Sequence, residues 1–387
     1  MDPPAVQAWL EQRQPLWAEI LEELVRIESP SGDAAAIQRC AEAVAGWIQR
    51  LLEPRRLELG SEQGVPHLIM RTGDGAGPGV LLLAHLDTVW EVGSFQPLFA
   101  VAEGRASGPG VFDMKGGVVI ALAALAALRA TGAKLPPVTL LCTGDEEVGS
   151  LASRPLIEAE ASRGTAVFVL EAASGKSVKV ARKGVGNYQL RLLGRAAHAG
   201  LEPERGVNAV VELAGLVSGV AAIAKPELGT TVTPTVFHGG HRTNVVPAQA
   251  ELVVDVRFAT AAEAERVDRE LRALRPAHPQ AVLEVGGGAN RPPLEAAASA
   301  SLFKIATGVA ASLGWPPLQS ASVGGGSDGN FTAALGVPTL DGLGAVGGNA
   351  HAAGEWIDLA SLAARAALLA GCVESIGREA STSTTPP

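Results

Sequence analysis

The chain has 387 residues, 47% of them hydrophobic and 18% charged, so it is long enough for two domains and too apolar to be disordered. Its formal net charge is −9, which argues against nucleic-acid binding because a nucleic-acid surface requires a basic face. The three cysteines lie far apart without a CxxC pair, so they predict neither a disulfide framework nor a cysteine zinc site.

The start of the chain predicts a cytoplasmic protein. Residues 1–7 carry neither the basic nor the apolar segment of a signal peptide. The longest apolar stretch, 116–128, is too short to cross a bilayer, and its small residues suit a buried helix. Unpaired cysteines indicate a reducing compartment. We therefore expect no membrane partner.

The first part of the chain predicts two helical regions followed by buried strands. Apolar residues at helical spacing mark 5–27 and 34–52, and Asp33 is expected to cap the second region. Four short apolar runs predict strands of a mostly parallel sheet that is covered on both faces. These runs are 65–71, 80–86, 138–142 and 166–170. An apolar helix is predicted over 117–130, after a Gly-, Pro- and Ser-rich segment, 89–112, that is typical of a long functional loop.

Polar side chains follow three of these predicted strands. His85 and Asp87 are two residues apart, so on an extended chain they point the same way. The acidic run 145–147 follows the strand over 138–142, and Glu171 follows the next strand. Open α/β sheets bind ligands at the carboxyl ends of their strands. A satisfied His–Asp pair or a solvated acidic turn would explain each motif alone, but three strands with such ends indicate a functional site.

Two further candidates lie outside the strands. Asp113 precedes the helix over 117–130, where the helix dipole favours a carboxylate, and a simple N-cap is the alternative explanation. His351 ends a second backbone-exposing loop, 347–351. Helices are predicted over 296–313 and 360–377.

An inserted domain is predicted in the middle of the chain, where apolar and polar residues begin to alternate. Such alternation is typical of an antiparallel sheet with one face in water. Its predicted elements are strands over 187–193, 250–258 and 281–285 and helices over 206–224 and 260–273. We therefore expect an α+β domain over 183–292, ending in a return linker at 286–293, inserted into a core of 1–182 and 293–387. The core is expected to be α/β, with a mostly parallel mixed sheet between helices.

The polar residues named above form a set that suits metal binding. The set is His85, Asp87, Asp113, Glu146, Glu147, Glu171 and His351. Two imidazoles and several carboxylates suit zinc or a similar first-row metal. Carboxylates gathered this closely repel one another unless cations neutralise them, which favours a two-metal site over an empty acidic pocket.

Five separated motifs then match a known family in order. They are His85-x-Asp87-Thr88-Val89, Gly110-Val111-Phe112-Asp113-Met114-Lys115-Gly116-Gly117, Asp145-Glu146-Glu147-Val148-Gly149-Ser150, Leu170-Glu171 and Gly348-Asn349-Ala350-His351. The chain resembles the zinc-dependent amidohydrolases and exopeptidases of the aminoacylase, acetylornithine deacetylase and glutamate carboxypeptidase type, from about residue 20 to 377. The resemblance implies a zinc-exopeptidase-like core with two Zn²⁺ per chain, which Co²⁺ or Mn²⁺ could replace.

The resemblance also implies a role for each metal ligand. His85 and Glu171 would bind one ion, and His351 and Glu147 the other. Asp113 would bridge the two ions, and its bond to the next residue is a cis peptide in relatives.

Two residues would act beside the metals. Asp87 would orient His85 by accepting its second N–H, and Glu146 would be the general base that later protonates the leaving amine. Glutamate at position 171 resembles the deacylase, desuccinylase and carboxypeptidase G branch more than the dipeptidase branch.

Three residues of the inserted domain match substrate-binding positions of the family, and a fourth could join them. His198, in Gly194-Arg195-Ala196-Ala197-His198-Ala199-Gly200, would stabilise the oxyanion, in relatives often in the partner subunit's site. Asn244 and Arg257 match positions that hold the substrate carboxylate, and Arg291 could join them. The backbone of 325–327 could bind the same carboxylate. A lone surface histidine and a solvent-facing arginine remain the alternatives, and a homodimer through this domain is expected.

Other functions fit less well. Gly325-x-Ser327-x-Gly329 matches the serine-hydrolase elbow, but Asp341 and His351 lie too close together for the usual triad order. Ser301-x-x-Lys304 matches a β-lactamase signature inside an ordinary amphipathic helix and has no partner motif. A metal- or ligand-binding protein on the same fold is the non-enzymatic alternative.

The predicted reaction is hydrolysis of an amide bond to release a C-terminal amino acid from a peptide or N-acyl amino acid. A glutamate carboxypeptidase and an N-acyl-amino-acid deacylase share every residue named, so both stay open. The segments 322–328 and 341–344 resemble the glutamate carboxypeptidase side more closely.

Overall fold

The structure is a computed structural model that describes residues 2–73, 79–133 and 135–382. The chain forms two compact units. Unit 1 consists of Met1–Ala181, Ala296–Val323 and Ser327–Pro387, and unit 2 of Arg182–Glu295 with Gly324–Gly326. Each unit has its own hydrophobic core.

Unit 1 is built on a six-stranded sheet with the order β1-β2-β6-β3-β7-β14. The strands are β1 (Arg56–Glu62), β2 (Val65–Arg71), β3 (Gly79–His85), β6 (Val138–Thr143), β7 (Gly164–Val169) and β14 (Thr339–Leu340). Strands β6, β3, β7 and β14 run parallel, whereas β1 and β2 pair antiparallel at one edge. The predicted mostly parallel mixed sheet is therefore confirmed.

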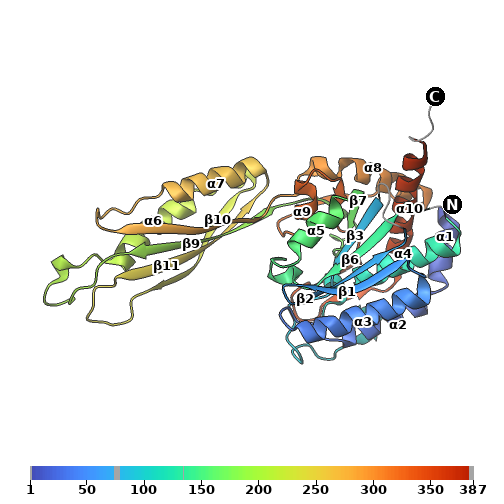
Figure 1. Cartoon of the computed structure of the whole chain (residues 1–387), viewed down its shortest axis with the longest axis horizontal. Helices are drawn as coiled ribbons and strands as arrows, with labels where there is room; N and C mark the ends of the chain where they lie inside the picture. Colours follow the sequence, from blue (N-terminus) through green and yellow to red (C-terminus); the bar gives the residue numbers. More distant parts are fainter. Residues whose placement is uncertain (1, 74–78, 134, 383–387) are drawn as a thin grey trace. The chain divides into compact units, whose positions relative to one another are not determined.

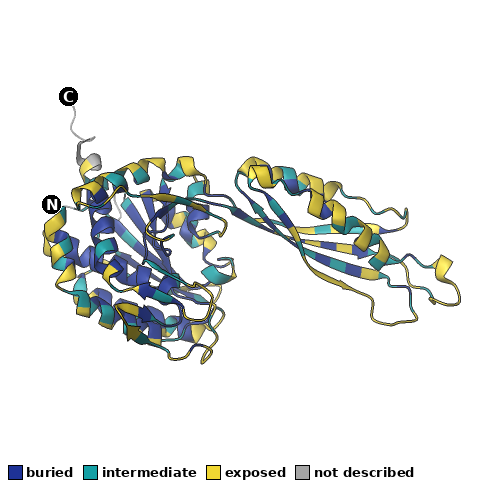
Figure 2. Ribbon diagram, turned by 180° about the vertical axis from the view of Figure 1, so that it is seen from behind, coloured by how far each residue is buried: buried dark blue, intermediate teal, exposed yellow. Residues whose placement is uncertain are grey.

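Helices cover both faces of this sheet, as Figure 1 shows. Because side chains alternate along a strand, Val80 and Leu82 of β3 join one core while Leu81 and Leu83 join the other. The first core includes residues of α1 (Pro3–Glu11), α2 (Gln14–Arg26), α3 (Ala34–Leu51), α4 (Gly116–Ala130), α8 (Ala296–Ser312) and α10 (Ala360–Thr382). The second core includes residues of α5 (Arg154–Ala161) and α9 (Gly329–Ala334). Strands β2, β3, β6 and β7 between these layers are largely buried, whereas the edge strand β1 has no buried residue (Figure 2).

Two apolar helices of the described chain, Val111–Ala130 and Ala360–Arg378, are long and apolar enough to span a membrane. They are 94% and 72% buried inside the protein. A turn at 111–115 lengthens the first beyond the apolar stretch read from the sequence. Packing in the core of unit 1 accounts for the apolar character of both helices.

Several N-terminal elements differ from the sequence prediction. The helical region over 5–27 is two helices, because the chain breaks at 12–13 and restarts with Pro15 in the first turn of α2. Asp33 caps α3 as predicted, since its Oδ1 accepts from the Ala36 N–H at 2.9 Å.

The predicted long loop at 89–112 contains the hairpin β4 (Ala100–Ala102) and β5 (Arg105–Ser107), so reading it wholly as loop is wrong. These strands form a small sheet with β15 (Gly347–Gly348) and β16 (Trp356–Asp358). The loop is thereby tied to the segment that carries His351. A further pair joins β8 (Val178–Arg182) to β13 (Ser320–Val323).

Unit 2 is a four-stranded antiparallel sheet, β10-β11-β9-β12, that packs against two helices. The elements are β9 (Gly184–Leu193), α6 (Ala209–Ala222), β10 (Thr231–Gly239), β11 (Gln249–Phe258), α7 (Ala261–Ala273) and β12 (Val282–Arg291), with short turns of helix, η3 (Pro203–Arg205) and η4 (Pro226–Leu228). Alternate residues of β9 and β11 face the helices, as the sequence pattern predicts.

The predicted return linker is wrong over 286–291, because these residues continue β12 beside β9. Glycine is required there: Gly287 has φ +79°, and a Cβ would lie 2.1 Å from the Asn187 carbonyl oxygen. The run of glycines therefore permits close pairing of two strands rather than forming a turn.

Candidate metal centre

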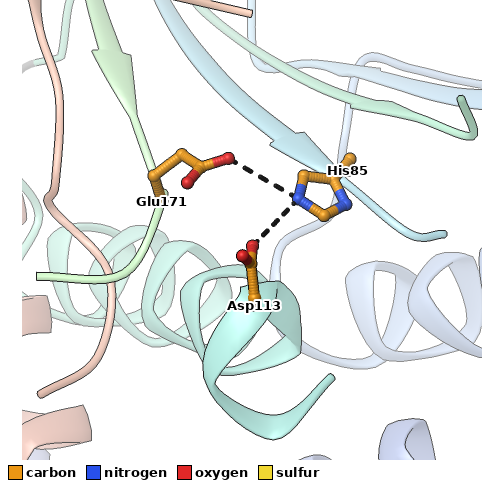
Figure 3. A group of neighbouring side chains, drawn as sticks. All are labelled: His85, Asp113 and Glu171. Atoms are coloured by element: carbon orange, nitrogen blue, oxygen red, sulfur yellow. Dashed lines mark hydrogen bonds and ion pairs between the residues drawn. The ribbon is translucent and has the colours of Figure 1, made fainter. Parts of the chain in front are cut away.

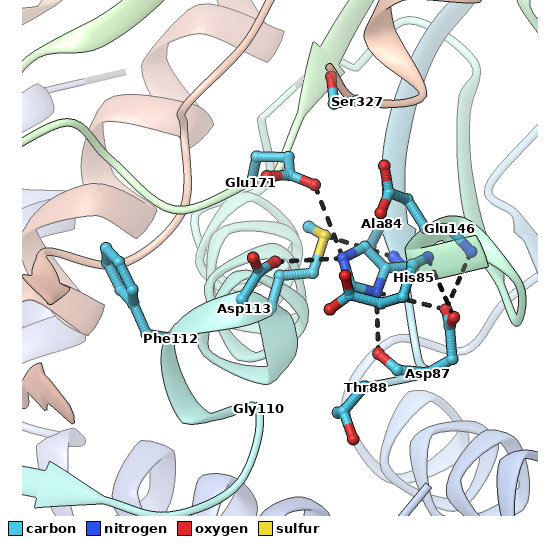
Figure 4. Close-up of polar contacts among 12 residues, drawn as sticks. Ala84, His85, Asp87, Thr88, Gly110, Phe112, Asp113, Glu146, Glu171 and Ser327 are labelled. Carbon is cyan, nitrogen blue, oxygen red and sulfur yellow. Dashed lines mark hydrogen bonds and ion pairs between the residues drawn. The ribbon is translucent and has the colours of Figure 1, made fainter. Parts of the chain in front are cut away.

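The parallel strands bring three of the predicted polar segments together. His85 is the last residue of β3, Glu171 follows the end of β7, and Glu146 opens the short helical turn η2 (Glu146–Val148) after β6. Strand β3 pairs with both β6 and β7, so the carboxyl ends of the three strands meet. Figure 4 shows His85, Glu146 and Glu171 close together.

Asp113 lies at the same centre, although it comes from the turn before α4 rather than from the end of a strand. It lies in the turn η1 (Val111–Lys115) with non-helical φ and ψ, and its peptide bond to Met114 is cis. Helix α4 begins at Gly116 with Lys115 at its N-cap, so the alternative reading of Asp113 as a simple N-cap is wrong. Gly117 allows the close approach, because a Cβ there would lie 2.0 Å from the Leu170 carbonyl oxygen.

The first cluster consists of His85, Asp113 and Glu171 (Figure 3). His85 Nε2 lies 3.2 Å from Asp113 Oδ1 and 3.6 Å from Glu171 Oε1. His85 is fully buried, and Lys179 Nζ lies 3.9 Å from the other Glu171 oxygen. One imidazole nitrogen and two carboxylates therefore converge on one point.

The second cluster consists of Asp113, Glu147 and His351. His351 Nε2 lies 3.3 Å from Asp113 Oδ2 and 3.2 Å from Glu147 Oε2. Half of the His351 side chain is exposed, and its φ is +59°. Asp113 thus directs one carboxylate oxygen at each histidine and belongs to both clusters.

Asp87 holds the backbone of the acidic turn more closely than it holds His85. Its carboxylate accepts from the backbone N–H groups of Glu146 at 3.1 Å and Glu147 at 3.2 Å, and from the Ser31 hydroxyl at 2.7 Å. His85 Nδ1 lies 3.0 Å from the Asp87 carbonyl oxygen and 3.4 Å from its carboxylate. The nearest partner of the second His85 nitrogen is therefore a backbone oxygen rather than the expected carboxylate.

The clustered carboxylates stabilise positive charge strongly. Burial opposes protonation of His85, but its contacts with Asp113, Asp87 and Glu171 raise its pKa well above the usual value. Asp113 and Glu147 raise the pKa of His351 to about 10. Burial favours the neutral form of Asp113, yet the two histidines hold its pKa well below the usual range.

The side chains also fit a metal on chemical grounds. Glu147 Oε1 is buried and has no hydrogen-bond partner in the part of the chain that the structure describes. An orphaned carboxylate oxygen is costly unless a cation satisfies it. Each cluster offers one imidazole and two carboxylates, with ligand atoms within 4.8 Å of one another, which suits zinc and similar ions.

Glu355 supports this centre and was missed in the sequence. Its carboxylate is fully buried and accepts four N–H groups. Oε1 accepts from the backbone of Phe112 at 2.8 Å and Asp113 at 3.0 Å, and Oε2 accepts from the Trp90 indole at 2.7 Å and the Gly110 backbone at 3.2 Å. The only sequence signal is its position four residues after His351 in the same loop.

The four predicted substrate-binding residues belong to unit 2. His198 and Asn244 lie in adjacent loops, where the Ala199 N–H donates to the Asn244 carbonyl at 3.0 Å. Arg257 and Arg291 both lie opposite Val185, on the two strands that flank β9. The Arg257 side chain pairs with Asp255 at 2.8 Å, and Arg291 is buried.

The serine-hydrolase alternative is not supported by the contacts. Ser327 is buried, and its hydroxyl donates to Asp341 at 2.6 Å. The histidine that this alternative needs, His351, contacts Asp113 and Glu147 instead. Among the described residues, Ser327 therefore does not form the serine–histidine pair that this alternative requires.

Comparisons with known proteins identify the family. A sequence model of Peptidase family M20/M25/M40 matches residues 81–375. The chain is 30% identical over 374 residues to carboxypeptidase G2 of Pseudomonas sp. (strain RS-16), covering 94% of this chain and 90% of that protein. It is 30% identical over 355 residues to succinyl-diaminopimelate desuccinylase of Alkalilimnicola ehrlichii, covering 84% and 90%.

Solved structures share the fold. Aminopeptidase PepT from Bacillus cereus superimposes with a TM-score of 0.75 at 21% identity, over 94% of this chain and 98% of that one. The resemblance read from the motifs is confirmed: the chain belongs to Peptidase family M20/M25/M40, whose enzymes are metal-binding hydrolases.

Proposed function

We propose that this chain is a two-zinc hydrolase that cleaves an amide bond to release a C-terminal amino acid, with the specificity of a glutamate carboxypeptidase. The observation that carries the proposal is the sharing of Asp113 between two clusters of metal-type ligands. A carboxylate that directs one oxygen at each of two histidines is suited to bridge two cations. Co²⁺ or Mn²⁺ could take the place of zinc.

The proposed ligands of one ion are His85 and Glu171, those of the other are Glu147 and His351, and Asp113 is shared. When bound, two such ions polarise a carbonyl group and make a water more acidic. Glu146 accepts the proton of the attacking water and returns it to the leaving amine. The backbone N–H of Glu146 donates to Asp87 at 3.1 Å, which supports this role by tying its turn to the strand end that carries His85.

Unit 2 is proposed to close over the substrate and to carry the dimer contact. His198 Nδ1 accepts from the backbone N–H groups of Gly200 and Leu201, both at 3.1 Å, so the neutral ring carries its proton on Nε2. A donor at Nε2 suits a developing oxyanion. Asn244, Arg257 and Arg291 are proposed to hold the substrate carboxylate, for which guanidinium groups are well matched.

Relatives support two substrate classes. Similarity to carboxypeptidase G2 over nearly the whole chain favours release of glutamate from a peptide-like amide. Similarity to a desuccinylase over most of the chain supports the second candidate, an N-acyl-amino-acid deacylase. A metal- or ligand-binding protein without turnover is the third candidate function. Three buried free cysteines agree with the proposed cytoplasmic location.

The test is release of free amino acids from a panel of N-acetyl, N-succinyl and peptidyl amino acids, including γ- and α-linked aryl-glutamates. Release that stops with a chelator and returns with Zn²⁺, strongest for C-terminal glutamate, would support the proposal. Strongest release from N-succinyl or N-acetyl substrates would move the assignment to the deacylase. No release from the protein with two equivalents of metal bound would favour the binding protein.

The base is tested separately with Glu146→Ala, using Glu158→Ala as the matched control, a half-buried glutamate of α5 that pairs with Arg154. We expect Glu146→Ala to keep its metals and lose turnover by more than about 1000-fold, within the range of general acid–base catalysis and positioning combined. Turnover near that of the control would remove Glu146 from the mechanism.

A further inference from the structure

Unit 1 has a cavity whose lining is separate from the metal centre. It has a volume of about 400 Å³ and lies between the segment 315–319 and the beginning of α10. Its wall is mainly apolar and is formed by Trp315, Pro316, Pro317, Leu318 and Val346. None of the proposed metal ligands lines it. A cavity of this size can hold a small organic molecule.

Arg365 contributes a buried positive charge to the lining. Its side chain is 3% exposed, its Nε donates to the Gly344 carbonyl at 3.0 Å, and its Nη2 donates to the Gly342 carbonyl. Among the described residues no carboxylate forms an ion pair with this guanidinium. Burial lowers the pKa of Arg365 to about 10. A buried cation that has only neutral partners is costly, and an anion beside it would offset the cost.

A second cation stands at the same cavity. Lys176 is exposed and has neither a hydrogen bond nor an ion pair to the part of the chain that the structure describes. The remaining charged group of the lining, Asp358, is engaged at the start of α10, where its Oδ1 accepts from the Ala360 N–H at 3.0 Å. The N-terminal end of this long helix adds partial positive charge.

The balance of these groups selects the kind of ligand. Two cations against one carboxylate leave one excess positive charge, which suits a monoanion better than a phosphate ester. The apolar wall, with the Trp315 ring, suits an aromatic or branched hydrocarbon body. A guanidinium group binds a carboxylate through hydrogen bonds in planar geometry, and an ammonium group adds a compact positive charge beside it.

We propose that this cavity binds a small aromatic monocarboxylate, with the carboxylate at Arg365 and Lys176 and the ring against Trp315 and Leu318. The inference does not rest on the proposed hydrolase function, because the cavity shares no residue with the metal centre. Arg365 also holds Gly344, whose N–H donates to the Glu171 carbonyl at 2.9 Å, so the site adjoins the backbone of a proposed metal ligand.

The decisive probe is 4-bromophenylacetate, because bromine can be located by anomalous scattering in a crystal. We expect a bromine peak between Trp315 and Leu318 and a calorimetric binding signal that 2-phenylethylamine, of similar shape and opposite charge, does not give. A bromine peak only at the metal centre, or equal binding of the amine, would overturn the proposal.

Variants separate this cavity from any carboxylate site near the metals. Lys176→Glu and Trp315→Ala should each weaken binding at the cavity by at least tenfold. Lys304→Glu, an exposed lysine on α8, is the matched charge control and should bind as the wild type does. Peptide or acyl-amino-acid turnover should stay the same in all three. Unchanged 4-bromophenylacetate affinity in both cavity variants would refute the assignment.

Discussion

Glu355 offers the sharpest test of how the metal centre is built. In Glu355→Gln the shape of the side chain is kept, but one of its two acceptor oxygens becomes an NH₂ donor. Each Glu355 oxygen accepts two N–H groups in the structure, so the amide loses the two hydrogen bonds to the oxygen that its NH₂ group replaces. Hydrogen bonds to a charged acceptor contribute about 1.5–3 kcal/mol each, so the gross loss is about 3–6 kcal/mol.

Part of that loss is recovered, because the amide no longer carries a buried charge. Burial raises the pKa of Glu355 despite its four donors, which indicates that its ionised form is held at a cost. We expect a net loss of about 3 kcal/mol. If this loss disorders the turn at 110–113, part of the free energy of metal binding is used to order it again. The Zn²⁺ affinity then falls by up to about 100-fold, since 1.4 kcal/mol corresponds to tenfold.

The assay is competition for Zn²⁺ with a chromophoric chelator, alongside urea unfolding of the metal-free protein. The control is Glu160→Gln, which removes a buried carboxylate of the same unit that pairs with Arg71 and Arg163. Glu160 lies beside the first residues of β3 and β7, at the opposite end of these strands from the centre. The control should lose stability without losing metal affinity. Equal metal affinity in Glu355→Gln and the control would refute the positioning role.

Three further predictions follow from the contacts and the pKa shifts. The neighbouring carboxylates raise the pKa values of His85 and His351, so metal binding must displace protons from these histidines. Zn²⁺ affinity should therefore rise with pH through the neutral range, and calorimetry in two buffers should show proton release. Zero release at pH 7 would contradict this prediction. Asp87→Asn should slow turnover by about 10–100-fold even when Zn²⁺ saturates both positions, because the acidic turn loses part of its anchor; a rate within twofold of wild type would argue against it. Arg266 lowers the pKa of Glu263 to about 2, so the ionised Glu263 stabilises unit 2 fully above about pH 4.5 and this stabilisation disappears towards pH 2. In Glu263→Gln, acid unfolding should lack the loss of stability between these two pH values.

Residues at strand ends were predictable, because short runs of apolar residues identify buried parallel strands. The parallel arrangement then brings the carboxyl ends of these strands together. His85, the acidic turn and Glu171 follow this rule. Strand β10 was missed because Pro234 argues against a strand; it lies at the irregularity of an edge strand, where proline is tolerated. The extension of β12 was missed because glycines usually indicate a turn, whereas Gly287 serves close strand pairing.

Glu355 shows why part of the centre has no sequence pattern. Three of its four donors are backbone N–H groups, and these exist at almost every residue, so no residue type marks them. The same holds for Asp87, which accepts from two backbone groups of the acidic turn. A pattern of side chains identifies the ligands, but the acceptors that fix the ligands' backbone are visible only in three dimensions.

Glu355 and Asp87 each hold a different part of the metal centre in position. Glu355 holds the turn that carries Asp113, the residue common to both clusters, and Asp87 holds the turn that carries Glu146 and Glu147. Loss of Glu355 should therefore weaken both metal positions together, whereas loss of Asp87 should act mainly on the base and on the position that contains Glu147. Sequential Zn²⁺ titration of the two variants separates these effects: a single weakened step in Glu355→Gln, or two in Asp87→Asn, would show that the division is wrong.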